Sequence, residues 1–226
     1  AGNVMYGIEL GVLYRGEREL CFLPLAHAYS CAFNFLVPMA VGAHVYLLGK
    51  VPSPKILLKA FEEVKPNLIL TVPLILEKIY KKMILPQLSK TTMKVALNIP
   101  LLDSRIYAQI RKKLVDAFGG RFREVIVGGA AMNEEVTNFL YKIKFPFTIG
   151  YGMTECGPLI SYDHNAEYVP GSCGQILKGI MKVRIDSEDP CNKVGEIQVS
   201  GENVMKGYYK NEEATSKVFT EDGWLR

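Results

Sequence analysis

The sequence contains no apolar run long enough to span a bilayer. The closest run, residues 31–48, is interrupted by Asn34, Pro38, Gly42 and His44. No secretory signal opens the chain, and its five cysteines are odd in number and lack CxxC spacing. These absences argue against a membrane-spanning protein, a disulfide framework and a zinc site. We therefore expect reduced thiols and a cytoplasmic location.

Strong charge is also missing. The formal net charge of +4 over 226 residues is too small to favour nucleic acid as a partner. It permits, at most, a peripheral contact with anionic lipid. Apolar residues make up 49% of the chain, and this share predicts a sizeable folded core rather than disorder.

Short apolar segments alternate with amphipathic helical patterns through most of the chain. Strands are predicted at residues 20–25, 44–48, 67–72, 125–127 and 147–149. Ser53 and Pro54 indicate the start of one of the helices, with Ser53 as N-cap. The alternation predicts an α/β fold, with a mostly parallel sheet covered by helices on both faces.

The pattern changes after Tyr168. Residues 181–186 and 195–200 are predicted to form short strands, and residues 189–193 have the composition of a turn between them. We expect an α/β domain over residues 1–167 and part of a small antiparallel β lobe over residues 168–226.

Two predicted strands end in glycine-rich turns. Residues 147–149 are followed by Gly150-Tyr151-Gly152-Met153-Thr154-Glu155, and residues 125–127 by Gly128-Gly129-Ala130. A right-handed crossover places both turns at one edge of the sheet, where parallel α/β folds bind ligands. We expect His27 and Tyr29, which follow residues 20–25, to lie at the same edge. A carboxylate behind a tight turn can hold Mg²⁺, and a polyphosphate ligand with its metal would suit this layout.

Each of these residues also has an ordinary structural interpretation. Glu155 could cap a helix, His27 could be a hydrogen-bonded structural histidine, and Tyr29 and Phe33 could belong to the core. The glycines could simply serve the strand-to-helix turns.

Taken together, the motifs are more specific than any one of them. In order, they are Leu23-Pro24-Leu25-Ala26-His27, Val127-Gly128-Gly129-Ala130-Ala131, residues 150–155, Val194-Gly195-Glu196-Ile197, Gly207-Tyr208-Tyr209 and Asp222-Gly223-Trp224-Leu225. This set resembles the adenylate-forming superfamily of acyl-CoA synthetases, adenylation domains and luciferases. Residues 73–80 resemble the branch that acts on long-chain fatty acids.

The resemblance implies that a carboxylate attacks ATP to give acyl-AMP and pyrophosphate, and that coenzyme A then displaces AMP. It implies catalytic roles for Thr154, Glu155 and His27, with Glu155 binding Mg²⁺. The nucleotide-binding residues would be Gly128, Gly129, Ala130, Gly150, Tyr151, Gly152, Met153 and Thr154. The acyl-binding residues would be His27, Tyr29, Phe33 and Val72. ATP, Mg²⁺ and coenzyme A are thus the expected cofactor and co-substrates, and a fatty acid is the expected carboxylate.

Some parts of the family pattern are absent. The phosphate-binding loop, the Thr-Gly-Asp that follows Asp222-Gly223-Trp224-Leu225-Arg226, and the domain with the catalytic Lys are not in this sequence. We therefore expect an internal fragment that does not catalyse the reaction alone; robust pyrophosphate exchange would refute this. Unpaired sheet edges would favour self-association. Adenylation of an aryl or amino acid, loading of a carrier protein, and a non-catalytic nucleotide-binding module remain alternatives.

Overall fold

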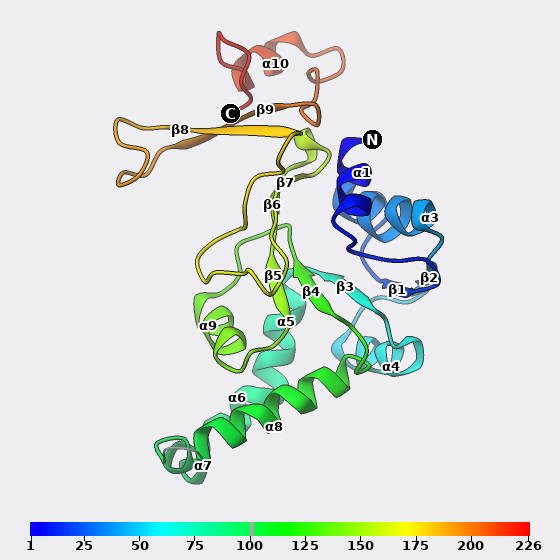
Figure 1. Ribbon diagram of the computed structural model, residues 1–226, viewed down its shortest axis with the longest axis vertical. Helices are drawn as coiled ribbons and strands as arrows, with labels where there is room; N and C mark the ends of the chain where they lie inside the picture. Colours follow the sequence, from blue (N-terminus) through cyan, green and yellow to red (C-terminus); the bar gives the residue numbers. More distant parts are fainter. Residues whose placement is uncertain (100–101) are drawn as a thin grey trace.

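A five-stranded parallel sheet forms the centre of the computed structural model, which describes residues 1–99 and 102–226 (Figure 1). The strand order is β2-β1-β3-β4-β5. The bounds are β1 Arg18–Cys21, β2 His44–Leu47, β3 Leu68–Thr71, β4 Glu124–Val127 and β5 Phe147–Ile149. The predicted parallel α/β fold is confirmed. The first strand ends at Cys21, earlier than predicted; Pro24, which has no N–H for a ladder, follows soon after.

Alternate residues of each central strand pack into different apolar cores. Ile69, Val125 and Val127 belong to one core, whereas Leu68, Leu70 and Ile126 belong to the other. Successive side chains of a strand point to opposite faces, so the two cores lie on opposite faces of the sheet. This explains why the strands are continuously apolar.

Helices cover both faces. One face carries α4 Pro54–Val64, α5 Pro73–Ile79, α8 Leu102–Ala117 and α9 Glu134–Lys142, with α6 Leu85–Leu88 and α7 Thr91–Ala96 further out (Figure 1). The other face carries α1 Gly2–Glu9, α2 Ala28–Ser30 and α3 Val37–Val41. Helix α4 begins as predicted, with the Ser53 side chain accepting a hydrogen bond from the Ile56 N–H at 3.4 Å.

Helices α2 and α3 are joined by a π-helical segment, η1 Cys31–Leu36. A second π-helical segment, η2 Tyr80–Ile84, continues α5. The apolar periodicity of the sequence does not reveal such widened turns, which are often found near functional sites.

Smaller antiparallel pairs follow the central sheet. β6 Tyr151–Gly152 pairs with β7 Leu159–Ser161 across the 3₁₀ turn η3 Thr154–Cys156, and β8 Met181–Asp186 pairs with β9 Glu196–Gly201. Helix α10, Glu212–Val218, lies beside β9 at the end of the molecule away from α8 (Figure 1). The predicted antiparallel lobe is confirmed, whereas the β6–β7 hairpin was not predicted. The boundary at residue 167 remains a prediction.

Within the described ranges, no helix combines the length and the apolar character needed to cross a membrane.

Candidate functional site

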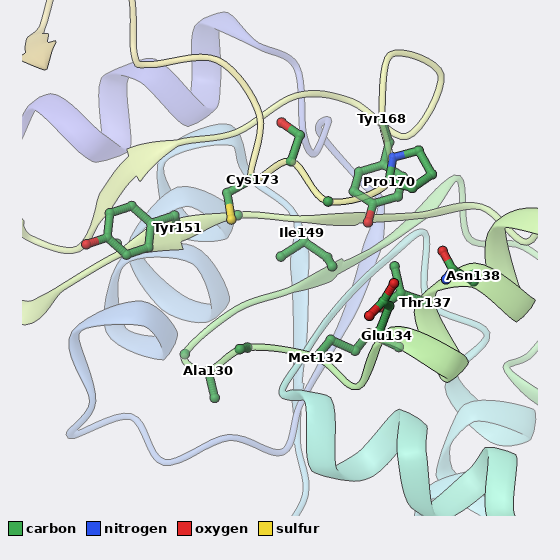
Figure 2. Close-up of a pocket in the computed structure, with 16 residues that line it drawn as sticks. Ala130, Met132, Glu134, Thr137, Asn138, Ile149, Tyr151, Tyr168, Pro170 and Cys173 are labelled. Carbon is green, nitrogen blue, oxygen red and sulfur yellow. The ribbon is translucent and has the colours of Figure 1, made fainter. Parts of the chain in front are cut away.

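A crevice made of two adjoining cavities lies where β4 and β5 end. The larger cavity, about 610 Å³, is lined by residues 129–132, the first turns of α9, residues 149–152, Tyr168 and residues 170–173. Figure 2 shows the segment with Tyr168, Pro170 and Cys173 on one side of it and Ala130, Met132 and Thr137 on the other.

The smaller cavity, about 200 Å³, is lined by His27, Tyr29, residues 126–129, residues 150–154, Pro158 and Leu159. The two cavities share four residues: Gly129, Gly150, Tyr151 and Gly152. The structure therefore brings together both glycine-rich turns, His27 and Tyr29, as expected from the topology. The roles assigned to these residues remain predictions.

The β6–β7 hairpin fixes the position of the second turn. The Met153 N–H donates to the Pro158 carbonyl at 2.9 Å. A Cβ on Gly152 would lie 2.1 Å from that same carbonyl oxygen, so a side chain at this position would force the strands apart. Met153 and Thr154, which follow Gly152, line the smaller cavity.

Tyr29 closes the inner side of the smaller cavity. Its hydroxyl donates to the Ile126 carbonyl at 3.1 Å, and the side chain is buried. Burial raises the pKa of Tyr29, so the ring stays a neutral phenol. Cζ of Tyr29, the ring carbon that carries the hydroxyl, would lie 3.4 Å from a Cβ on Gly128. The ring is therefore directly against the first glycine-rich turn.

His27 lies at the mouth of the smaller cavity and is exposed. Its Nδ1 accepts from the Tyr29 N–H at 3.3 Å, which makes His27 the N-cap of α2. No residue of the described chain bonds to Nε2. Nδ1 of His27 therefore has a structural role as a helix cap, whereas Nε2 is free to contact a ligand.

The two remaining acyl-binding candidates do not line either cavity of the crevice. Phe33 is buried behind Tyr29, with ring centroids 6.1 Å apart. Val72 lies beside the first turn, where its Cγ1 would be 3.7 Å from a Cβ on Gly129. Phe33 therefore supports the wall of the crevice and is separated from its interior by Tyr29.

Glu155 is held from outside the crevice. Its Oε1 accepts from the Tyr208 hydroxyl at 2.8 Å, and its carbonyl accepts from the Met205 N–H at 2.7 Å. Glu155 lies inside η3, but its carboxylate bonds to Tyr208 and does not cap a helix. Thr154, directly before it, lines the smaller cavity.

The donor set at Glu155 fits Mg²⁺ only in part. Among the described residues, no group of three His, Cys, Asp or Glu side chains could enclose a metal ion. Mg²⁺ is often bound by one or two carboxylates together with phosphate oxygens and water. Glu155, next to the Thr154 hydroxyl, is suited to that arrangement and not to a metal cage made of protein alone.

Two further long-range contacts were not predicted. The Asn3 side chain donates to the Cys156 carbonyl at 2.9 Å and accepts from the Leu159 N–H at 2.9 Å. On β4, Glu124 accepts from the Tyr162 hydroxyl at 2.6 Å, at the end of the strand away from the crevice. Both contacts join residues far apart in the sequence, and no local pattern points to them.

Comparison with known proteins gives consistent results. The family model of AMP-binding enzymes matches residues 2–209. Long-chain-fatty-acid–CoA ligase 4 of Saccharomyces cerevisiae is 30% identical over 100% of this chain and 35% of its own length. 4-Coumarate-CoA ligase 1 of Narcissus pseudonarcissus is 30% identical over 91% of this chain and 34% of its own length.

The fold also matches a solved structure. ATP-bound MatB from Rhodopseudomonas palustris superposes with a TM-score of 0.74 at 20% identity, over 99% of this chain and 39% of that protein. The chain thus spans about a third of the length of the curated relatives that it matches. Because the family model covers most of the sequence, the chain belongs to the family of AMP-binding enzymes.

Proposed function

We propose that the chain provides the nucleotide-binding crevice of an ATP-dependent acid–thiol ligase. Such an enzyme forms an acyl-AMP and passes the acyl group to coenzyme A. The observation that carries this proposal is the shared wall of the two cavities, in which Gly129, Gly150, Tyr151 and Gly152 adjoin both. Two ligands in contact, a nucleotide and an acid, would fill such a crevice.

The larger cavity suits the adenine base of ATP. Its volume of about 610 Å³ is within the usual range for small-molecule sites. The backbone of Gly129 and Ala130 offers a flat surface without bulky side chains, and Tyr151 offers an aromatic ring against which a base can stack. From there, Met153 and Thr154 lead toward the phosphates.

The reaction would take place between the two cavities. An oxygen of the carboxylate attacks the α-phosphorus of ATP, and the bond from that phosphorus to the bridging oxygen breaks, releasing pyrophosphate. The thiolate of coenzyme A then attacks the acyl carbonyl carbon, and AMP leaves. The Thr154 hydroxyl would donate to an α-phosphate oxygen, and His27 Nε2 would lie by the carboxylate. Glu155 would hold Mg²⁺, which supplies neutralisation of phosphate charge when bound.

A fatty acid is the proposed carboxylate. The yeast relative, named as a long-chain-fatty-acid–CoA ligase, aligns over the whole chain, and the smaller cavity has apolar walls from Ile126, Tyr29 and Leu159. An aryl acid is the second candidate. The buried Tyr29 closes the smaller cavity at about 200 Å³, a space better suited to a compact ring than to a long alkyl chain.

Binding measurements on the chain test the proposed nucleotide site and the proposed acid in turn. We expect Mg²⁺·ATP to bind and GTP to bind at least about ten-fold more weakly, since the larger cavity is proposed to recognise adenine. A palmitoyl-AMP mimic should then bind more tightly than AMP, and a coumaroyl-AMP mimic that outcompetes it would favour the aryl acid. Equal binding of ATP and GTP would contradict the assignment of the nucleotide site.

A further inference from the structure

The side chain of Glu155 has one oxygen engaged and one free. Its Oε1 accepts a hydrogen bond from the Tyr208 hydroxyl at 2.8 Å, over a separation of 53 residues. Within the described part of the chain, no donor bonds to Oε2. The carboxylate therefore has a fixed orientation and a single oxygen left for another ligand.

The segment that carries Tyr208 is itself fixed. The Tyr208 N–H donates to Thr215 Oγ1 at 2.9 Å, and that hydroxyl donates to the Asn211 carbonyl at 2.8 Å. Gly207 has a φ of +146°, and a Cβ there would lie 2.7 Å from Thr215 Cγ2. These contacts join the segment that carries Tyr208 to the start of α10. The fold around α10 therefore holds Tyr208 close to Glu155.

A second tether acts on the backbone. The Met205 N–H donates to the Glu155 carbonyl at 2.7 Å, so the segment 205–208 bonds to both the main chain and the side chain of Glu155. The neighbouring Tyr209 has no such role: it is 87% exposed, and its ring contacts Lys210. Two adjacent tyrosines thus differ in whether they touch the turn of the crevice.

We propose that Tyr208 is a positioning residue for Glu155, which holds Oε1 and leaves Oε2 as the oxygen directed to Mg²⁺. The inference rests on the proposed function, because it assumes that Glu155 binds Mg²⁺ with ATP. Groups that orient a metal ligand commonly change metal affinity when they are removed, although they do not touch the metal.

The test compares Tyr208→Phe with its matched control Tyr209→Phe by calorimetric titration of the chain. ATP is titrated into each protein twice, once in the presence of Mg²⁺ and once in EDTA without Mg²⁺. We expect Tyr208→Phe to weaken binding of Mg²⁺·ATP about ten-fold and to leave binding of metal-free ATP unchanged. Tyr209→Phe should match the unmodified chain in both titrations. Equal behaviour of the two variants would overturn the inference.

Two further variants separate this inference from the proposed function. Glu155→Gln should abolish the difference between Mg²⁺·ATP and metal-free ATP, and adding Tyr208→Phe to it should have no further effect. An equal loss from Tyr208→Phe in the Glu155→Gln background would mean that the phenylalanine acts through the fold, and the inference would be wrong. If Glu155→Gln keeps the full Mg²⁺ dependence, or the unmodified chain binds no Mg²⁺·ATP, the proposed function fails and the inference with it. If Glu155→Gln loses the dependence but Tyr208→Phe does not, only the inference fails.

Discussion

The Asn34 side chain donates to Glu19 Oε1 at 2.6 Å, and neither side chain is exposed to solvent. Glu19 belongs to β1 and Asn34 to the π-helical segment η1, so the bond joins the sheet to the helices above it. The second oxygen, Oε2, has no hydrogen-bond partner in the described chain. Burial raises the pKa of Glu19 to about 8, and the group is therefore mainly the neutral acid at pH 7.

This pair predicts a specific pH dependence of stability. The unfolded chain ionises Glu19 near pH 4.5, whereas the folded chain retains the proton up to about pH 8. The unfolded state thus binds fewer protons in this window, and the free energy of unfolding falls as pH rises, by roughly 5 kcal/mol in total. Glu19→Gln should remove this fall and be the more stable form at pH 8, as measured by urea unfolding at pH 5 and pH 8.

The control for that experiment is Glu62→Gln, which changes an exposed glutamate of α4. It should retain the pH dependence of the unmodified chain. Parallel pH profiles for Glu19→Gln and the unmodified chain would show that the buried carboxyl does not retain its proton on folding.

Gly152→Ala should disrupt the crevice. The added Cβ would lie 2.1 Å from the Pro158 carbonyl oxygen, so the hairpin has to open, at a cost of roughly 1–3 kcal/mol. We expect a lower melting temperature and weaker binding of Mg²⁺·ATP. Gly49→Ala is the matched control, since nothing lies within 4 Å of its Cβ position, and it should leave both properties unchanged.

Tyr151→Ala tests the stacking surface. Loss of the ring should weaken ATP binding about ten-fold, a factor typical of one aromatic–base stack. Tyr151→Phe keeps the ring and should bind ATP like the unmodified chain. A strong effect of the phenylalanine variant would assign the binding energy to the hydroxyl and contradict base stacking.

Asn3→Ala should destabilise the turn behind Thr154 and Glu155. It removes two hydrogen bonds of a side chain that is 3% exposed and leaves the Cys156 carbonyl and the Leu159 N–H without that partner. We expect a loss of roughly 2 kcal/mol in thermal or urea unfolding. Asn192→Ala, in an exposed turn, is the control and should have little effect.

Local patterns predicted most of the fold. The strands of the central sheet, the N-cap at Ser53 and the β8–β9 pair depend on residues close together in the sequence, and each was found near its predicted position. The convergence of the two glycine-rich turns followed from the handedness of parallel crossovers.

The contacts that complete the site could not be predicted in this way. Asn3 and Leu159 are 156 residues apart, and Glu155 and Tyr208 are 53 apart. Such pairs are selected by tertiary packing, which leaves no periodic signal. Phe33 shows the opposite difficulty: the family resemblance implied an acyl-binding role, but Phe33 lies behind the ring of Tyr29 and does not line the cavity.

Tyr151 adjoins both cavities, and this has a thermodynamic consequence. A molecule bound in either compartment must order the same Tyr151 ring. The second molecule therefore binds without the loss of conformational entropy that ordering this ring requires. Occupancy of one compartment should therefore raise affinity in the other, and by an identical factor whichever molecule is added first.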